Sequence, residues 1–375
     1  MYEYDELVER LRKMEFDKTE PELLTSLLNK AMDKGEYEKE RLKRISKKSL
    51  KLFKFLADER CFCRIDCESD TLEYLKRTPI GGVDGSFQVV GGIGGKWYVF
   101  LGFSQVIAKA CFTTNPIIRV DGDIQDIEAV DEGDARRQAE LLMMHGEIEG
   151  FRKIANELDS KKEPCILIDG PIIDPPTLIE EKYVDRRVSA LKYCYERKID
   201  VVGFVKRVSS NGYVNFLKNK FQEKLGEANF NVFVNDSDFL STTMFEAVKE
   251  MKSPVYTYPV SYDESCYNNV YEYYKRKGGL TLYYSYYKPS LRARIFRIEY
   301  VSFRELNKDE LCKKFEKIMN MIRLWTLPGM DEPLPIMLAH NKCNVRRGAA
   351  ETLYHEIMTR ALSEGVHPLW LSEEI

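Results

Sequence analysis

The sequence predicts an α/β protein in which a mixed β-sheet is flanked by helices. Two short apolar segments, 83–86 and 166–170, each contain an Asp-Gly pair. Such segments are typical of buried strands that stop at a turn, because glycine accepts backbone angles that other residues avoid. Glycine-rich stretches also separate apolar runs between residues 79 and 120, which is the pattern of strands joined by hairpins. Longer segments with helical periodicity follow, so strands and helices alternate along the chain.

The first 75 residues are predicted to be helical. Leu7, Leu11 and Met14 recur at helical spacing, and Pro21 is predicted to open a second helix. Within the stretch 41–54 the basic face of a helix either lies along phosphates or is simply exposed to solvent. The basic residues of this stretch are Arg41, Lys43, Arg44, Lys47, Lys48, Lys51 and Lys54. We therefore divide the chain into a helical N-terminal region, 1–75, and a main domain, 76–375.

The first half of the main domain is predicted to contain five strands and two helices. Three hairpin-linked strands come first, and a helix, a strand, a helix and a strand follow. This is the element order of an RNase H-like fold, in which the first and fourth strands are neighbours in the sheet. The predicted strands are 79–90, 96–107, 117–120, 165–169 and 201–206, and the predicted helices are 134–158 and 185–197.

The second half of the main domain is predicted to add strands and then helices. Segments rich in strand formers come first, and Asn344 is predicted to cap the last helix. A dense group of tyrosines suits cross-strand packing better than base stacking. These tyrosines are Tyr271, Tyr273, Tyr274, Tyr283, Tyr284, Tyr286 and Tyr287. The predicted strands are 231–234, 255–260, 280–287 and 295–300, and the predicted helices are 308–324 and 345–363.

Composition excludes several classes of protein. The chain has 375 residues, 31% of them charged, and a net charge of -3. It is therefore not a uniformly basic nucleic-acid binder, although a nuclease with an acidic centre stays compatible with this charge. No run of about 18 apolar residues is present, which argues against a membrane span. Nine cysteines and a polar N-terminus without an export signal predict a cytoplasmic protein rather than a disulfide framework.

Asp84 and Asp169 follow the apolar runs of the first and fourth predicted strands. Neighbouring strands lie about 4.8 Å apart, so carboxylates at matching ends are close enough to share metal ions. Mg²⁺ or Mn²⁺ would keep both acids ionised and form the core of a two-metal phosphoryl-transfer site. A lone Asp-Gly pair more often forms only a turn. Two such pairs on adjacent strands favour metal binding.

Five segments of the main domain contain candidate functional residues in a characteristic order. They are Val-Asp-Gly-Ser at 83–86, followed by Leu-Gly-Phe-Ser at 101–104; Arg-Arg-Gln-Ala-Glu at 136–140, ahead of Leu-Ile-Asp-Gly at 167–170; Val-Gly-Phe-Val-Lys-Arg at 202–207; Arg-Ile-Glu at 297–299; and Pro-Leu-Pro-Ile-Met-Leu-Ala-His at 333–340. In this order and spacing, over residues 79–360, they resemble the NurA nuclease family.

This resemblance implies a metal-dependent DNA nuclease with an RNase H-like core and two bound ions, Mn²⁺ or Mg²⁺. It further implies 5′-to-3′ exonuclease and single-strand endonuclease activity, with duplex ends and single-stranded DNA as substrates. The expected assembly is a homodimer that works with a HerA-type hexameric ATPase in DNA end processing and double-strand break repair. No membrane association is expected.

The resemblance assigns the acidic residues of the site unevenly. Asp84 and Asp169 match the two Asp-Gly motifs of the family, and Glu140 matches its helical acid. The stretch between Glu140 and Asp169 is longer than usual, so Glu147 and Glu149 compete with Glu140. Glu140 and Glu147 are seven residues apart and share one helical face, so the sequence does not separate them.

Lys206 matches a strand-end lysine of the family, and His340 matches its C-terminal histidine. Lys206 would place a positive charge on the scissile phosphate. His340 would ligate a metal, together with Asp84, Glu140 and Asp169, or move a proton to or from the attacking water. Pro171 and Glu332 depart from the family pattern. They leave open an alternative function, a weak or inactive DNA-binding subunit that regulates a hexameric ATPase.

Other sequence patterns are weaker evidence for a functional site. Cys61, Cys63 and Cys67 have a spacing that is weak evidence for a metal, and they lack a nearby fourth ligand. The glycine-rich segment 91–95 is not a phosphate loop, because Trp97 stands where a Walker motif has Ser or Thr. Any ATP-driven motor must therefore come from a partner. An actin-like kinase fold also opens with an Asp-Gly strand, but the second glycine-rich phosphate segment that it needs is missing.

Overall fold

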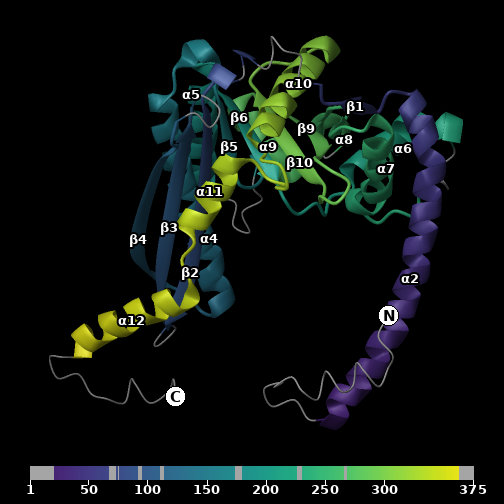
Figure 1. Ribbon diagram of the computed structural model, residues 1–375. Coiled ribbons are helices and arrows are strands. Elements are labelled where there is room, and N and C mark those ends of the chain that lie inside the picture. Colours follow the sequence, from purple (N-terminus) through teal and green to yellow (C-terminus); the bar gives the residue numbers. More distant parts are fainter. Residues whose placement is uncertain are drawn as a thin grey trace.

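A single ten-stranded sheet runs through the chain in the computed structural model (Figure 1). The structure describes residues 21–66, 73–74, 76–91, 95–109, 114–173, 180–225, 230–265 and 268–362. The order of neighbouring strands is β1-β7-β9-β10-β6-β5-β2-β3-β4, and β8 pairs with β9. The strands are β1 Phe62–Arg64, β2 Ile80–Gly91, β3 Lys96–Ala108, β4 Ile117–Glu128, β5 Cys165–Ile168, β6 Asp200–Val205, β7 Val255–Thr257, β8 Val260–Ser261, β9 Thr281–Lys288 and β10 Phe296–Ser302.

The predicted RNase H-like core is confirmed in one half of this sheet. Strands β2, β3 and β4 form an antiparallel meander, and β5 and then β6 lie parallel to β2 on its other side. The first and fourth strands of the main domain are therefore neighbours, as the element order predicts. Beyond β6 the sheet continues antiparallel through β10, β9, β7 and β1.

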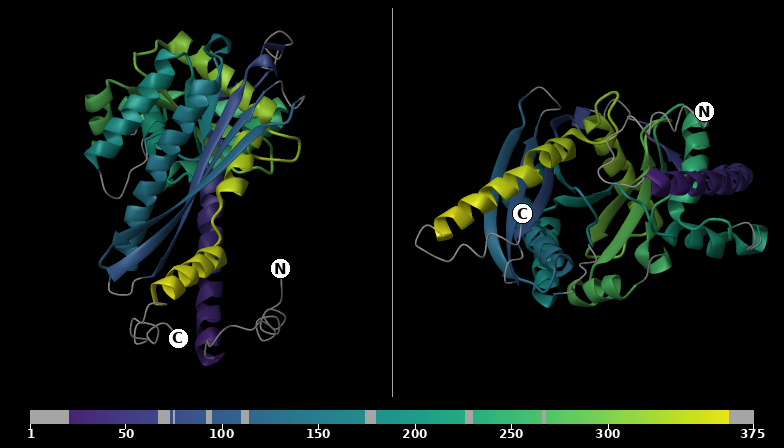
Figure 2. Two further views of the ribbon diagram at one scale, coloured as in Figure 1. Left: turned by 90° about the vertical axis from the view of Figure 1, so that its left-hand side faces the viewer. Right: turned by 90° about the horizontal axis from the view of Figure 1, so that it is seen from below.

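Helices cover both faces of the sheet (Figure 2). The larger hydrophobic core lies under α2, α4, α5, α6, α7 and α9, and a second core on the opposite face lies under α10 and α11. The helices are α2 Pro21–Asp58, α4 Glu132–Glu157, α5 Glu181–Glu196, α6 Gly212–Leu225, α7 Asp236–Met251, α8 Tyr262–Ser265, α9 Asn269–Gly278, α10 Lys308–Trp325, α11 Leu334–Cys343 and α12 Arg347–Leu362, with a short 3₁₀ turn at Ser160–Lys162. Each face of the central strands is therefore buried, which suits their continuous apolar runs.

The basic helix of the N-terminal region is α2. Its apolar residues Ile45, Leu52, Phe53 and Leu56 are buried in the larger core, and the helix packs on α7. Lys47 and the other lysines of this stretch lie mainly on the opposite, outward side. The N-terminal half of α2 extends beyond the rest of the described chain (Figure 1). Whether the basic side contacts phosphates stays a prediction.

Several predicted elements differ from the structure. The region predicted to be helical contributes β1, which pairs with β7 far along the chain. The strand expected at 231–234 is wrong: Phe233 is buried, but Val234 is 70% exposed and the segment leads into α7. Asn344 follows α11 as its C-cap. Strand β4 includes the predicted segment 117–120 and continues to Glu128. Most residues of this continuation are exposed, so no apolar run in the sequence indicates it.

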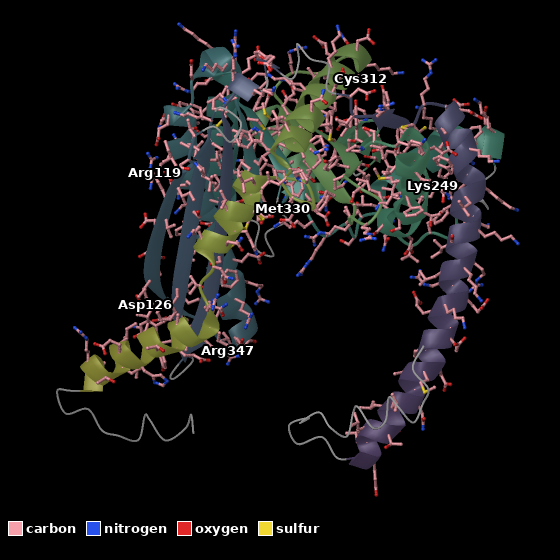
Figure 3. All side chains as sticks on the ribbon, viewed as in Figure 1. Arg119, Asp126, Lys249, Cys312, Met330 and Arg347 are labelled. Carbon is pink, nitrogen blue, oxygen red and sulfur yellow. The ribbon has the colours of Figure 1, made fainter. Side chains whose placement is uncertain are left out.

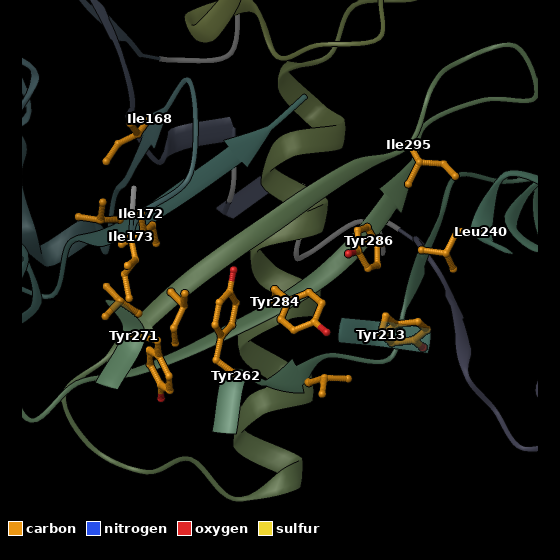
Figure 4. Close-up of a cluster of buried hydrophobic side chains, with 14 of the residues drawn as sticks. Ile168, Ile172, Ile173, Tyr213, Leu240, Tyr262, Tyr271, Tyr284, Tyr286 and Ile295 are labelled. Atoms are coloured by element: carbon orange, nitrogen blue, oxygen red, sulfur yellow. The ribbon is translucent and has the colours of Figure 1, made fainter. Parts of the chain in front are cut away.

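The tyrosine group packs inside the protein. All four tyrosines of β9 are buried, as are Tyr271 and Tyr274. Figure 4 shows several of these rings side by side in the larger core, and Tyr284 lies edge-on to both Tyr262 and Tyr286. The predicted packing role is therefore confirmed, and these six rings are not open to a nucleic-acid base. None of the helices in the described ranges is both long and apolar enough to cross a membrane.

Candidate metal centre

The two predicted aspartates meet at the ends of β2 and β5. Val83 pairs with Ile168 across the parallel strands, so Asp84 and Asp169 follow matched positions. The backbone N–H of Asp169 also donates to the carbonyl oxygen of Val83 at 3.1 Å. Both residues are nearly buried, with 8% of each side chain exposed. The adjacency predicted from the element order therefore brings the two carboxylates together.

The two Asp-Gly pairs play different structural roles. Gly170 has φ +147° and turns the chain at the end of β5, as predicted. The prediction of a turn after Asp84 is wrong, because β2 continues through Gly85 to Gly91. A Cβ atom on Gly85 would lie 2.8 Å from Cγ of Met143. Gly85 is therefore required because α4 lies close to β2 at this point.

Glu147 is the acid of α4 that reaches this part of β2. Because β5 ends at Ile168, the edge of β2 beyond Val83 is open on that side. The N–H of Gly85 donates there to Asp84 Oδ1 at 2.9 Å and to Glu147 Oε1 at 3.1 Å. Glu147 is 5% exposed, so it is a buried carboxylate beside Asp84.

Glu140 does not share this position. It lies two helical turns before Glu147, which is about 10 Å along the axis of α4. Its neighbour Ala139 packs with Val99 and Leu101, farther along the β2-β3 hairpin. Glu149 is also outside the cluster, since its carboxylate pairs with Arg186 on α5 at 2.7 Å. The geometry therefore separates two residues that the helical period does not, and it places Glu147 nearer to Asp84; which glutamate acts as the helical acid stays a prediction.

His340 and Lys206, the other two predicted site residues, lie beside the aspartates. His340 Nδ1 lies 2.8 Å from Asp84 Oδ2 and 3.4 Å from Asp169 Oδ2. Lys206 Nζ lies 2.7 Å from Asp169 Oδ2 and 2.8 Å from Glu332 Oε2. The imidazole is 57% exposed whereas the aspartates are not, so the cluster opens to solvent on the histidine side.

Helix α11 is held directly against the hairpin that carries Asp84. The Ser86 hydroxyl donates to the carbonyl oxygen of Cys343 at 2.5 Å, and the N–H of Val345 donates to the same hydroxyl at 2.9 Å. The Cys343 thiol donates to Asp84 Oδ2 at 3.3 Å. A Cβ atom on Gly102 of β3 would lie 2.1 Å from the carbonyl oxygen of Cys343. The glycine therefore permits the close approach that positions His340.

Sequence reasoning missed Ser86 and Cys343 as supporting residues and noted Glu332 only as a departure. Ser86 belongs to the Val-Asp-Gly-Ser segment and Cys343 to none of the quoted segments. Neither position reveals these contacts, which join segments about 260 residues apart along the chain. The carbonyl oxygen of Pro171 accepts a hydrogen bond from buried Arg187 at 3.2 Å, which anchors the segment after Gly170. Any residue offers this carbonyl, so the contact does not explain the proline itself.

Charge in the cluster is unevenly compensated. Burial raises the pKa of Asp84 despite hydrogen bonds from His340 and Cys343. Burial and the nearby charge of Asp84 raise the pKa of Asp169 to about 6, although Lys206 and His340 oppose the shift. Burial disfavours the charge on Lys206, but the carboxylates of Asp169 and Glu332 outweigh this effect and raise its pKa. Burial is therefore the main reason that both carboxylates are harder to ionise than an exposed aspartate.

The donor atoms suit a divalent cation. One ligand atom each from Asp84, Asp169 and His340 lies within 4.8 Å of the other two, and no other such group is found among the described residues. Carboxylate oxygens and imidazole nitrogen are ligands that Mn²⁺ accepts, and Mg²⁺ prefers the oxygens. A cation would also compensate the two buried carboxylates. Cys61 and Cys63 belong to no such group, and Cys67 lies outside the described residues.

The fold and this cluster define the class of the protein: an RNase H-like α/β protein with a carboxylate and histidine site at the ends of two central strands. The NurA domain family matches residues 78–345 of the sequence. The chain therefore belongs to the NurA family. No curated protein sequence matches it significantly.

Comparison with solved structures agrees with this fold. The NurA nuclease from Sulfolobus solfataricus is similar over 92% of this chain and 98% of its own, with a TM-score of 0.57 and 12% identity. Endonuclease V from Bacillus subtilis covers 78% of this chain and 97% of its own, with a TM-score of 0.34 and 12% identity. Human endonuclease V is similar over 81% of this chain and 99% of its own, with a TM-score of 0.34 and 12% identity. At 12% identity, the similarity to the NurA nuclease supports a shared fold. The TM-scores of the two endonuclease V structures are too low to support a conclusion.

Proposed function

We propose that this chain is a metal-dependent DNA nuclease that hydrolyses phosphodiester bonds. The observation that carries the proposal is the convergence of Asp84, Asp169 and His340, whose ligand atoms lie within 4.8 Å of one another. Membership of the NurA family and structural similarity to a NurA nuclease support the same chemistry. A buried acidic centre beside a lysine is typical of sites that bind cations and phosphates together.

Each residue of the cluster has a proposed role. Asp84, Asp169, Glu147 and His340 hold Mn²⁺ or Mg²⁺, with two ions expected. Such ions activate water and stabilise the leaving 3′-oxygen when bound. Lys206 neutralises the scissile phosphate. Asp169 and Glu332 position its ammonium for that contact. As an alternative to metal ligation, the exposed His340 side chain can accept a proton from the attacking water.

The finer features of the function rest on the family. We propose 5′-to-3′ exonuclease and single-strand endonuclease activity in the cytoplasm, in DNA end processing and double-strand break repair. We further propose a homodimer that works with a HerA-type hexameric ATPase. The boundary between an N-terminal region, 1–75, and a nuclease domain, 76–375, belongs to this proposal. Strand β1 of the N-terminal region pairs into the shared sheet, so the two regions are expected to fold together.

A nuclease assay on the purified protein tests the proposal. We expect cleavage of single-stranded and linear duplex DNA with Mn²⁺ and none with excess EDTA. Asp84→Asn and Asp169→Asn should each reduce the rate about 10²–10³-fold or more while far-ultraviolet circular dichroism stays unchanged. Full activity of either variant would refute the site. DNA binding without cleavage by the wild-type protein would favour the alternative, a regulatory DNA-binding subunit. In that case Lys206 would stay paired with the carboxylates of Asp169 and Glu332 and would not contact a scissile phosphate.

A further inference from the structure

A cavity lined by Lys206 adjoins the candidate metal centre, because Lys206 also contacts Asp169. Its volume is about 330 Å³. The walls come from the end of β6, the end of β9, the loop between β9 and β10, and one side of α7. Ile295, labelled in Figure 4 where the loop meets β10, also lines this cavity. The polar residues that line it are Lys206, Lys288, Arg294, Ser237 and Ser241.

Lys288 is the unusual member of this lining. It is 5% exposed, and its ammonium donates to the carbonyl oxygen of Ala293 at 2.5 Å. Within the described part of the chain, no carboxylate forms an ion pair with it. Burial lowers the pKa of Lys288, and the charge of Asp331 only partly opposes this effect. A buried ammonium without a counter-ion is unfavourable, so the cavity is suited to an anion.

The other two positively charged side chains of the cavity already bind a carboxylate. Lys206 and Arg294 both pair with the carboxylate of Glu332. This carboxylate therefore marks a position between two cations where anionic oxygen is stabilised. Lys206 also contacts Asp169, so the cavity and the metal centre share one residue. An anion in the cavity would consequently lie next to any group bound at the metal centre.

We propose that this cavity binds a phosphate group of the DNA strand that adjoins the scissile phosphate. The proposal rests on the proposed nuclease function. Lys288 and Arg294 would contact the phosphate oxygens, and the hydroxyl of Ser237 offers an additional donor. Phe245 and Leu291 give the cavity an apolar wall that suits the sugar or base of the same nucleotide. The ligand is thus a nucleotide phosphate, either a phosphodiester or a terminal phosphate.

A binding experiment separates this role from a purely structural one for Lys288. Wild type and Lys288→Met are compared by fluorescence anisotropy with single-stranded oligonucleotides in EDTA, with and without a 5′-phosphate. We expect affinity to fall about tenfold, and the slope of log K against log salt to decrease in magnitude by about 0.7. Weaker binding of both oligonucleotides would indicate a phosphodiester, and weaker binding of the phosphorylated one alone would indicate a terminal phosphate.

The control is Lys249→Met. Lys249, labelled in Figure 3, lies on the same helix α7 and pairs with Glu246 at the surface. Its replacement should change neither affinity nor salt slope. Equal behaviour of Lys288→Met and Lys249→Met would overturn the proposal.

A second pair of variants covers the case in which Lys288→Met fails to fold. Ser241 is exposed on α7 and lines the cavity. Ser241→Asp should weaken DNA binding about fivefold, whereas the neutral Ser241→Asn should bind like wild type. Equal binding of the two would also count against the subsite. Because binding is read in EDTA, a protein that binds DNA through this cavity but never cleaves it would refute the nuclease function and leave the phosphate subsite intact.

Discussion

Among single residues, Glu147 shows how one side chain is selected from several of the same kind. Glu140, Glu147 and Glu149 of α4 are the candidates for a metal ligand, and of these three Glu147 reaches the open edge of β2. Its carboxylate and that of Asp84 accept from the same N–H of Gly85. Glu149 is engaged with Arg186 instead. A hydrogen bond to strand backbone thus distinguishes residues that periodicity leaves equivalent.

A pair of substitutions on α4 tests this distinction. Glu147→Gln should lower the rate of DNA cleavage about 10–100-fold, because the site loses a negative charge beside Asp84. Glu140→Gln should change the rate by no more than about twofold. Initial rates at saturating Mn²⁺ provide the comparison. The reverse ranking of the two variants would restore Glu140 as the helical acid.

At the scale of elements, the contact between α11 and the β2-β3 hairpin sets the geometry of the site. His340 comes from α11, Asp84 from β2 and Asp169 from the end of β5, so no single element carries the ligand set. Ser86 and Gly102 hold or admit the helix at its C-terminal end. A small displacement of α11 would move His340 relative to both aspartates.

Gly102→Ala tests the importance of this contact. The new methyl group would meet the backbone of Cys343, so we expect a loss of about 1–3 kcal/mol in the free energy of unfolding together with weaker Mn²⁺ binding. Gly122→Ala is the matched control. Gly122 pairs with Gly102 across β3 and β4, and its Cβ would meet Leu101 at 3.4 Å, an ordinary contact. Urea denaturation and titration calorimetry provide the two measurements. If both alanine variants bind Mn²⁺ like wild type, α11 does not need this close approach.

For the whole molecule, the metal centre links stability to pH. Asp169 has its pKa raised to about 6 in the folded protein, against about 3.9 in an unfolded chain. A raised acid pKa contributes stability that is fully present below about pH 4 and is lost as the pH rises through about 6. The metal-free protein should therefore be less stable at pH 8 than at pH 5 because of this residue.

Asp169→Asn removes that titration. In EDTA the variant should gain about 1–2 kcal/mol relative to wild type between pH 5 and pH 8. This is less than the full shift implies, because pH 5 already lies above the unfolded pKa and part of the proton-linked stability is lost before the window begins. Urea denaturation of both proteins at the two pH values measures the difference. With Mn²⁺ at pH 8, wild type should be the more stable of the two proteins, because its Asp169 carboxylate binds the ion. A constant difference between the proteins across this pH range would contradict the expectation.

The sequence predicts the central part of this molecule better than its margins. Strands β2 and β5 follow from apolar runs and from element order, and with them the meeting of Asp84 and Asp169. Strand β4 is longer than predicted because an exposed edge strand has no apolar run to reveal it. Pairing of β1 with β7 depends on tertiary contacts between distant segments. The cavity beside Lys206 likewise combines residues from the end of β6, from α7 and from the loop between β9 and β10. No local pattern reports either of them.

The two rims of the sheet bear on how copies of the protein can meet. One rim is β1, only three residues long, and the other is the twelve-residue β4. Asp121, Asp123, Asp126 and Glu128 are exposed along β4. A second β4 laid alongside would set acid against acid, and such juxtapositions are repulsive. Self-assembly into an extended ribbon is thereby discouraged, and two copies that associate are directed to other surfaces.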